Sequence, residues 1–168
     1  MKNKISGTFI KEIFCFEVGG CKLKETDQNQ YEINVRWAKG KEMVVIKPGE
    51  IKRHSTYINI RFLPKDCDYV LIDIEDKNIF FIELKQSSGT STASKVAEQL
   101  KGGVAWIEHL FFIMGIKDEY EDFSKFFIHS ACNSRARSKR NYLGTKKNGV
   151  YKINGSQLNL LPFINGQC

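Results

Sequence analysis

Residues 67–86, CDYVLIDIEDKNIFFIELKQ, contain two nearly continuous apolar runs that charged residues interrupt only at their edges. Each run is apolar at successive positions, so both faces of an extended chain would be apolar. This pattern is typical of central strands that are covered on both sides. The polar stretch EDKN at 75–78 indicates a turn between the runs. We therefore expect a buried hairpin with strands at about 68–74 and 79–85.

Three charged residues stand at the open end of this hairpin: Asp68, Glu83 and Lys85. Because side chains alternate along a strand, Glu83 and Lys85 share one face of the sheet. A two-residue loop, with Glu75 opposite Asn78, would place Asp68 directly opposite Lys85 and on that same face. A one-residue bulge in the turn would break this arrangement. We expect the three charged side chains to converge.

Two carboxylates beside an ammonium group suit the hydrolysis of a phosphodiester. Carboxylates are hard oxygen ligands for Mg²⁺, which keeps several waters and binds phosphate oxygens. The ion polarises the phosphodiester and favours ionisation of a water, while Lys85 would neutralise charge growing on the phosphate or orient the attacking water. The alternative is an ordinary solvated strand face. Glu83 follows four consecutive apolar residues, however, and burying unpaired charge is costly, which favours the functional interpretation.

The other segments predict an α/β or α+β protein built around a mixed sheet. An amphipathic helix is expected at about 93–114, where Gly102-Gly103 favours a kink. Part of residues 5–16 fits either a helix or a strand, and both assignments stay open. Strands are expected at 14–18, 31–37, 43–46, 57–62, 126–129 and 149–153.

The 168 residues predict one domain, 1–168. The five cysteines are odd in number and include no C-x-x-C pair, which indicates free thiols in a reducing cytosol. No signal peptide is evident at the N-terminus. The longest apolar stretch, 104–116, contains Glu108 and His109 and is too short to span a bilayer. We expect a cytoplasmic protein without a membrane partner.

The net charge of +7 is concentrated in the C-terminal part, because residues 123–168 contain eight Lys or Arg and no Asp or Glu. Such a field suits a polyanion, and contacts to phosphates would release counterions from DNA or RNA. A solvated basic loop is the alternative. His129, at the end of the strand expected before this loop, is the histidine that we single out for testing. The predicted nucleic-acid contacts are Arg135, Arg137, Lys139, Arg140, Lys146 and Lys147.

The segments CDYVL, FFIELKQ and AEQLKGG together resemble the core of the PD-(D/E)XK nuclease superfamily, which has the restriction-endonuclease-like fold. The resemblance implies a hairpin-centred mixed β-sheet with flanking helices. It implies that Asp68, Glu83 and the carbonyl of Leu84 bind Mg²⁺, with Mn²⁺ as a substitute. Lys85 would be catalytic, and Gln99 would be the polar residue that the superfamily often places on the following helix.

The sequence departs from the superfamily's pattern in two places. Cys67 replaces the proline that precedes the aspartate, a change that the superfamily tolerates. The acidic residue that many members carry on an N-terminal helix is not identifiable, and Glu12, Glu17 and Glu50 are weak candidates for it. The number of metal ions therefore stays open.

Residues and resemblance together predict a Mg²⁺-dependent phosphodiesterase that acts on nucleic acid, DNA before RNA, as an endonuclease rather than an exonuclease. The expected setting is restriction, phage defence or repair, which follows from the superfamily alone. Two alternatives stay open. One is a non-catalytic nucleic-acid-binding module. The other is a nuclease-fold subunit that is active only in a larger complex. A homodimer is compatible with cutting a duplex, which needs two sites.

Overall fold

A computed structural model of the chain describes residues 1–9, 12–25, 31–55, 65–86, 93–132, 145–147 and 149–165. The structure is mixed α/β, as the sequence predicts. The helices are α1 (Lys2–Thr8), α2 (Pro48–His54), α3 (Ala93–Ile113), α4 (Lys117–Glu121) and α5 (Leu161–Ile164). The strands are β1 (Phe14–Val18), β2 (Gly20–Glu25), β3 (Tyr31–Arg36), β4 (Glu42–Ile46), β5 (Tyr69–Asp73), β6 (Asn78–Gln86), β7 (Ser124–Cys132), β8 (Thr145–Lys147), β9 (Val150–Asn154) and β10 (Gln157–Asn159).

The main sheet has seven strands in the order β1-β4-β5-β6-β7-β9-β8. In this sheet β1, β4, β5 and β6 pair antiparallel with one another in that order. Strand β7, in contrast, is parallel to both of its neighbours, β6 and β9. A parallel neighbour requires a crossover connection, and the segment that contains α3 and α4 provides it between β6 and β7. A second sheet has three strands in the order β10-β3-β2.

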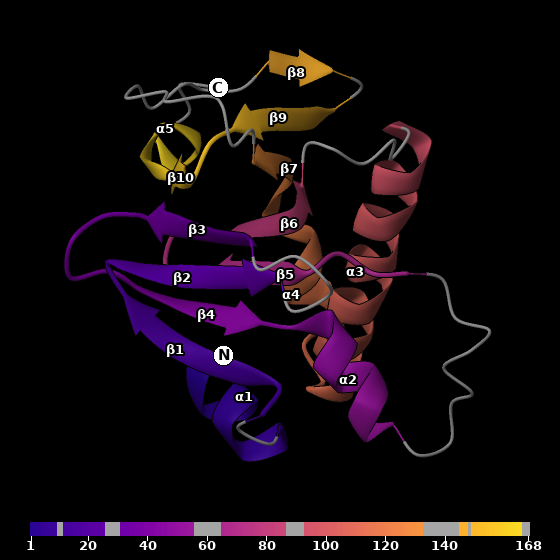
Figure 1. Ribbon diagram of the computed structural model, residues 1–168. Coiled ribbons are helices and arrows are strands. Elements are labelled where there is room, and N and C mark those ends of the chain that lie inside the picture. The colour runs from indigo at the N-terminus through magenta and orange to yellow at the C-terminus, as the bar shows by residue number, and fades with distance from the viewer. Residues whose placement is uncertain are drawn as a thin grey trace.

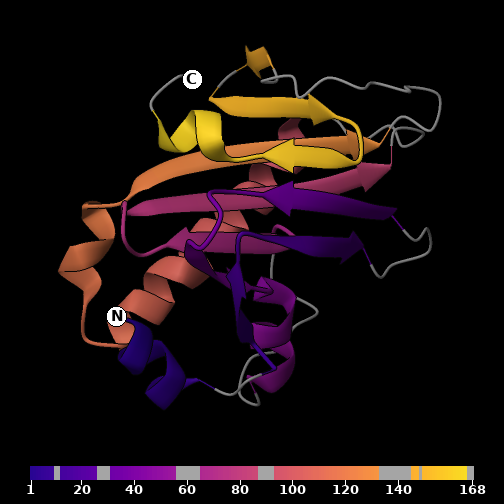
Figure 2. The same ribbon diagram turned by 90° about the vertical axis from the view of Figure 1, so that its left-hand side faces the viewer.

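The hairpin formed by β5 and β6 lies at the centre of the molecule because both of its faces are covered. Phe81 and its neighbours on one face pack against α3 and the helices around it. Phe80 and its neighbours on the other face pack against the second sheet and α5. Figure 1 shows α3 along one side of the main sheet, and Figure 2 views the molecule from the side of the second sheet. Burial on both faces explains the continuous apolar runs of these two strands.

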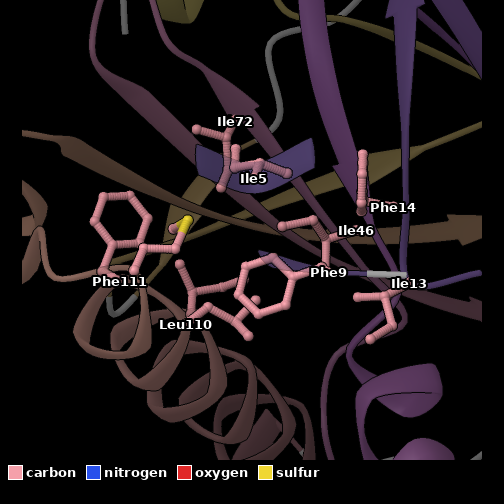
Figure 3. A pocket seen from close by; sticks show the side chains of 10 residues that line it. Ile5, Phe9, Ile13, Phe14, Ile46, Ile72, Leu110 and Phe111 are labelled. Atoms are coloured by element: carbon pink, nitrogen blue, oxygen red, sulfur yellow. The ribbon is translucent and has the colours of Figure 1, made fainter. Parts of the chain in front are cut away.

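The N-terminal helix packs over the helical face of the main sheet. Ile5 and Phe9 point toward Leu110 and Phe111 of α3 around a small cavity (Figure 3). The cavity measures about 10 Å³, and all ten of its lining residues are apolar. A space of this size without polar groups belongs to the core rather than to a binding site.

Most of the predicted elements are confirmed. Strands form where the sequence predicts them at 14–18, 31–37, 43–46, 126–129 and 149–153, and the predicted helix is α3. The segment 5–16, for which the sequence leaves a helix and a strand open, contains the end of helix α1 and the start of strand β1. The strand predicted at 57–62 lies outside the described residues. Within the residues that the structure describes, no helix is long and apolar enough to cross a membrane.

The two glycines in the middle of α3 permit a close contact, while α3 runs as one helix from Ala93 to Ile113. A Cβ atom on Gly103 would lie 2.3 Å from Cys67 Sγ, and one on Gly102 would lie 2.6 Å from the carbonyl oxygen of Lys65. Glycine at both positions therefore lets the helix pack directly on residues 65–67, the segment that leads into Asp68.

Candidate active site

The turn of the central hairpin is two residues longer than the two-residue loop that would place Asp68 opposite Lys85. Asp73 pairs with Asn78, so residues 74–77 form the loop. The Asp73 side chain accepts a hydrogen bond from the backbone N–H of Asp76 at 3.2 Å, and Lys77 adopts the left-handed conformation with φ of 53°. The predicted two-residue loop is therefore wrong, because the Asp73 side chain closes a wider turn.

The longer turn changes which residues face each other at the open end of the hairpin. Tyr69 pairs with Ile82, and extending this register by one residue places Asp68 opposite Glu83. The predicted opposition of Asp68 and Lys85 is therefore wrong by two residues. A shift of two residues leaves every side chain on its original face, because the side-chain period of a strand is two. The three charged residues still share one face.

Asp68 lies immediately before β5, and its carboxylate is fixed to the neighbouring strand. The backbone N–H of Leu84 donates a hydrogen bond to Asp68 Oδ2 at 2.7 Å. Leu84 lies between the other two charged residues of the site, so this bond holds the Asp68 carboxylate beside them. The carbonyl of Leu84 stays a predicted metal ligand.

Glu83 has no exposed surface, although its side chain is a carboxylate. Burial, together with the adjacent charge of Asp68, raises the pKa of Glu83 to about 8. The ammonium group of Lys85 acts in the opposite direction and favours the ionised form. The carboxylate is thus held in a place that disfavours its own charge, which is characteristic of functional sites.

Lys85 provides the nearest positive charge. Its Nζ lies 2.5 Å from Glu83 Oε1, and 26% of its side chain is exposed. Beyond this ion pair, neither oxygen of Glu83 accepts a well-aligned hydrogen bond from any described residue. Ala131 lies beside Lys85 in the sheet register, on β7.

Gln99 lies on the helix face that packs against this hairpin. Its exposed fraction is 9%, so Gln99 is largely buried rather than a residue of the solvent-facing side of α3. Residues four apart share a helix face, and Gly103 on that face contacts Cys67 and Phe81. Gln99 is one turn nearer the start of α3. The face of α3 that carries Gln99 is therefore the one that packs against the face of β6 that carries Glu83.

Asp66 forms a clamp that the sequence does not reveal. Lys52 Nζ of α2 lies 2.7 Å from Asp66 Oδ2, and Trp106 Nε1 of α3 donates to Asp66 Oδ1 at 3.1 Å. These two contacts hold the segment before Asp68 between two helices. Asp66 stands two residues before the candidate ligand, but its partners lie far away in the sequence, so only the fold brings the three together.

The residues present fit a hard cation. Two carboxylates are adjacent, and the buried oxygens of Glu83 lack well-aligned donors among the described residues. Carboxylate oxygens are the ligands that Mg²⁺ prefers. No group of three or more His, Cys, Asp or Glu suited to a metal occurs in the described part of the chain. A cation held by Asp68 and Glu83 would thus keep water or phosphate oxygens as further ligands.

The three weak N-terminal candidates for a third acid lie in different segments. Glu17 on β1 pairs with Met43 of β4, and the β4–β5 register extended by one residue places Met43 beside Asp73. Asp73 lies at the turn end of the hairpin, so Glu17 lies at the opposite end of the strands from the site. Glu12 is exposed before β1. Glu50, in the first turn of α2, accepts a hydrogen bond from Arg53 at 2.8 Å.

The predicted basic contacts fall largely outside the described residues. This applies to Arg135, Arg137, Lys139 and Arg140. Lys146 and Lys147 lie on β8, at the edge of the main sheet, and only their backbone is described. Their role as nucleic-acid contacts stays a prediction.

Comparison with known proteins identifies no relative: no family model, no curated protein and no solved structure matches the chain. The case for a function therefore depends on the chemistry of the site and on the motif in the sequence.

Proposed function

We propose that the chain is a Mg²⁺-dependent nuclease that hydrolyses phosphodiester bonds in nucleic acid, with DNA as the first expectation. One observation carries this proposal. Glu83 is a fully buried carboxylate next to a second carboxylate, Asp68, and its Oε1 lies 2.5 Å from Lys85 Nζ. Without a cation, this buried pair of carboxylates destabilises the folded state. A cation-binding site is a physical reason for a protein to retain such a destabilising pair.

A purely structural ion pair explains the site less well. A buried salt bridge satisfies its charges with matched partners and additional hydrogen bonds. Here the buried Glu83 lies beside a second carboxylate, Asp68, and the Glu83 oxygens lack well-aligned donors among the described residues. At the turn end of the same hairpin, the buried Asp73 carboxylate lies 2.6 Å from Lys41 Nζ, and its Oδ1 accepts a hydrogen bond from the backbone N–H of Asp76. One oxygen of Asp73 therefore has the well-aligned donor that both oxygens of Glu83 lack among the described residues.

The architecture agrees with what the resemblance to PD-(D/E)XK nucleases implies. A mixed sheet is centred on the β5–β6 hairpin, and α3 follows that hairpin and covers the face that carries Glu83. Asp68 and Glu83 take the places of the two motif acids, and Lys85 takes the place of the lysine. This agreement supports the proposal and does not depend on the predicted turn.

Each residue has a distinct part in the proposed chemistry. Asp68 and Glu83 hold the cation through carboxylate oxygens. Mg²⁺, when bound, polarises the phosphodiester and favours ionisation of a water. Lys85 extends from the buried pair toward solvent and orients the attacking water or stabilises charge growing on the phosphate. Gln99 faces this region from α3 and would orient water or phosphate.

Cleavage assays test the proposal. Purified protein is incubated with linear duplex DNA, circular duplex DNA, single-stranded DNA and RNA, in Mg²⁺, Mn²⁺ or EDTA. We expect metal-dependent cutting by the wild type and a loss of about a hundredfold or more in Glu83→Gln and Lys85→Ala, since each loses a group that acts in the reaction. Cutting of the circular substrate identifies an endonuclease.

Lys77→Ala is the matched control, because it removes an exposed lysine from the turn of the same hairpin. It should cut like the wild type. Binding to nucleic acid without metal-dependent cutting would contradict hydrolysis and identify a binding module. Cutting that appears only with an added partner protein would identify a subunit of a larger nuclease.

A further inference from the structure

The acid pair belongs to a longer row of polar side chains that crosses the main sheet. Glu83 on β6 is in register with His129 on β7, and His129 is in register with Lys152 on β9. When the β5–β6 register is extended by one residue, Asp68 lies opposite Glu83, on the other side of Glu83 from His129. Register partners share a face, and neighbouring strands lie about 4.8 Å apart. The row therefore runs Asp68, Glu83, His129, Lys152.

The sign of the charge changes along this row. Two carboxylates stand on the β5 and β6 side, whereas an imidazole and an ammonium group stand on the β7 and β9 side. Lys152 is exposed, and none of the ion pairs between described residues includes it. The side chains are thus separated into a place for a cation and a place for an anion.

His129 carries a buried polar atom that has no assigned role. Its Nε2 has no hydrogen-bond partner among the described residues. Buried polar groups in folded proteins are almost always paired, so an isolated one points to a missing partner. Burial, together with the charges of Lys152 and Lys85, lowers the pKa of His129. An imidazole carries at least one ring N–H in either of its ordinary protonation states, so His129 has a donor to offer.

We propose that His129 and Lys152 form a phosphate-binding subsite, and that the nucleic-acid backbone crosses the sheet from β6 over β7 to β9. The inference rests on the proposed function and assigns a direction to its substrate. Asp68 and Glu83 hold the cation at one end of the row. His129 donates a hydrogen bond to a phosphate oxygen beside them, and Lys152 contacts the next phosphate outward.

Binding measurements in EDTA test the subsite without any cutting. The probes are fluorescently labelled duplex and single-stranded DNA, titrated over a range of salt concentrations. Lys152→Ala should reduce the slope of log K against log salt by about 0.9 on duplex DNA, which corresponds to one lost phosphate contact. His129→Leu should weaken binding about tenfold, whereas His129→Gln, which keeps an N–H donor, should retain most of the affinity.

Lys125→Ala is the matched control. Lys125 lies on the same strand and face as His129 but about 13 Å away, since it is four residues earlier on β7. It contacts Glu121 and the ring of Tyr120. Its removal takes away one positive charge and should leave the salt slope unchanged. Equal slopes for Lys125→Ala and Lys152→Ala would overturn the subsite, as would wild-type affinity in His129→Leu.

The subsite and the proposed reaction can fail separately. A wild type that cuts DNA while both His129→Leu and Lys152→Ala bind and cut normally overturns the subsite alone. If the wild type never cuts, but the Lys152→Ala variant shows the salt slope expected for one lost phosphate contact, the proposed reaction is wrong and the subsite is supported. A wild type that binds neither probe overturns both. Because Lys152 is exposed, its variant should fold and keep the test decisive.

Discussion

At the scale of single residues, Glu83 is the side chain with the strongest conflict between chemistry and location. Its carboxylate is fully buried beside that of Asp68, with Lys85 as the nearby cation. A protonated Glu83 relieves this conflict, and so does a bound metal ion. Both outcomes give measurable consequences for stability.

The first prediction concerns pH. Burial and Asp68 raise the pKa of Glu83 from 4.5 to about 8, so between these values the metal-free folded protein binds a proton that the unfolded chain has lost. The free energy of unfolding should therefore fall by up to about 1.4 kcal/mol per pH unit in this window because of Glu83. Glu83→Gln lacks this group, so its stability relative to the wild type should increase from pH 5 to pH 8, as measured by urea unfolding in EDTA.

Glu98→Gln, which removes an exposed carboxylate from α3, controls for the loss of one negative charge. A stability difference between Glu83→Gln and the wild type that stays constant with pH would contradict the prediction. So would a Glu83→Gln variant that is less stable than the wild type at pH 8.

At the scale of elements, the contact between α3 and the segment before β5 determines where Asp68 lies. Gly102 and Gly103 allow the helix to approach residues 65–67, and Asp66 then reaches both Lys52 and Trp106. The position of the candidate ligand thus depends on a helix that contributes no charged residue to it.

Gly103→Ala should destabilise the protein by about 1–3 kcal/mol, because its Cβ would lie 2.3 Å from Cys67 Sγ and 3.4 Å from Phe81. Gly7→Ala is the control, since Gly7 lies in α1 and a Cβ there meets nothing within 4 Å. That change should be neutral or stabilise by up to about 1 kcal/mol. Chemical unfolding of both variants measures the difference, and equal effects would refute the close contact.

The sequence predicts the central hairpin well but not its register. The apolar runs before and after EDKN specify two buried strands, because only strands covered on both sides need apolar residues at every position. The register depends on the turn, where Asp73 binds the N–H of Asp76 and Lys77 adopts a positive φ. No local pattern distinguishes that turn from a shorter one. The assignment of each charged residue to one face of the sheet is still correct, because the register differs from the expected one by an even number of residues.

At the scale of the whole molecule, the fold gathers residues that are remote in the sequence. The acids come from the β5–β6 hairpin, His129 from β7 and Lys152 from β9. The sequence predicts the acids and singles out His129, since each stands at the end of an apolar strand. It does not predict Lys152 in the row or the clamp at Asp66, because these depend on how distant strands and helices meet.

The uneven charge of the chain leads to a prediction about nucleic-acid binding. Replacing the four basic residues of the C-terminal segment 133–144 with alanine should weaken DNA binding and reduce its salt dependence by up to about 0.9 per lost contact on duplex DNA. The replaced residues are Arg135, Arg137, Lys139 and Arg140.

A control variant removes the same charge from exposed positions in the N-terminal part: Lys4, Lys22, Lys24 and Lys39. Binding as a function of salt concentration compares the two variants. Equal losses would indicate attraction by net charge alone and would contradict a localised contact surface.

The central claim is that Asp68 and Glu83 are held together to bind a cation rather than to stabilise the fold. Thermal unfolding of the wild type and Glu83→Gln, each with EDTA and with Mg²⁺, tests it most directly. We predict that Glu83→Gln has the higher Tm in EDTA, and that Mg²⁺ raises the Tm of the wild type but not of the variant, because only the folded wild type binds the ion. A lower Tm for Glu83→Gln in EDTA, with no effect of Mg²⁺ on the wild type, would contradict the claim and identify the acid pair as structural.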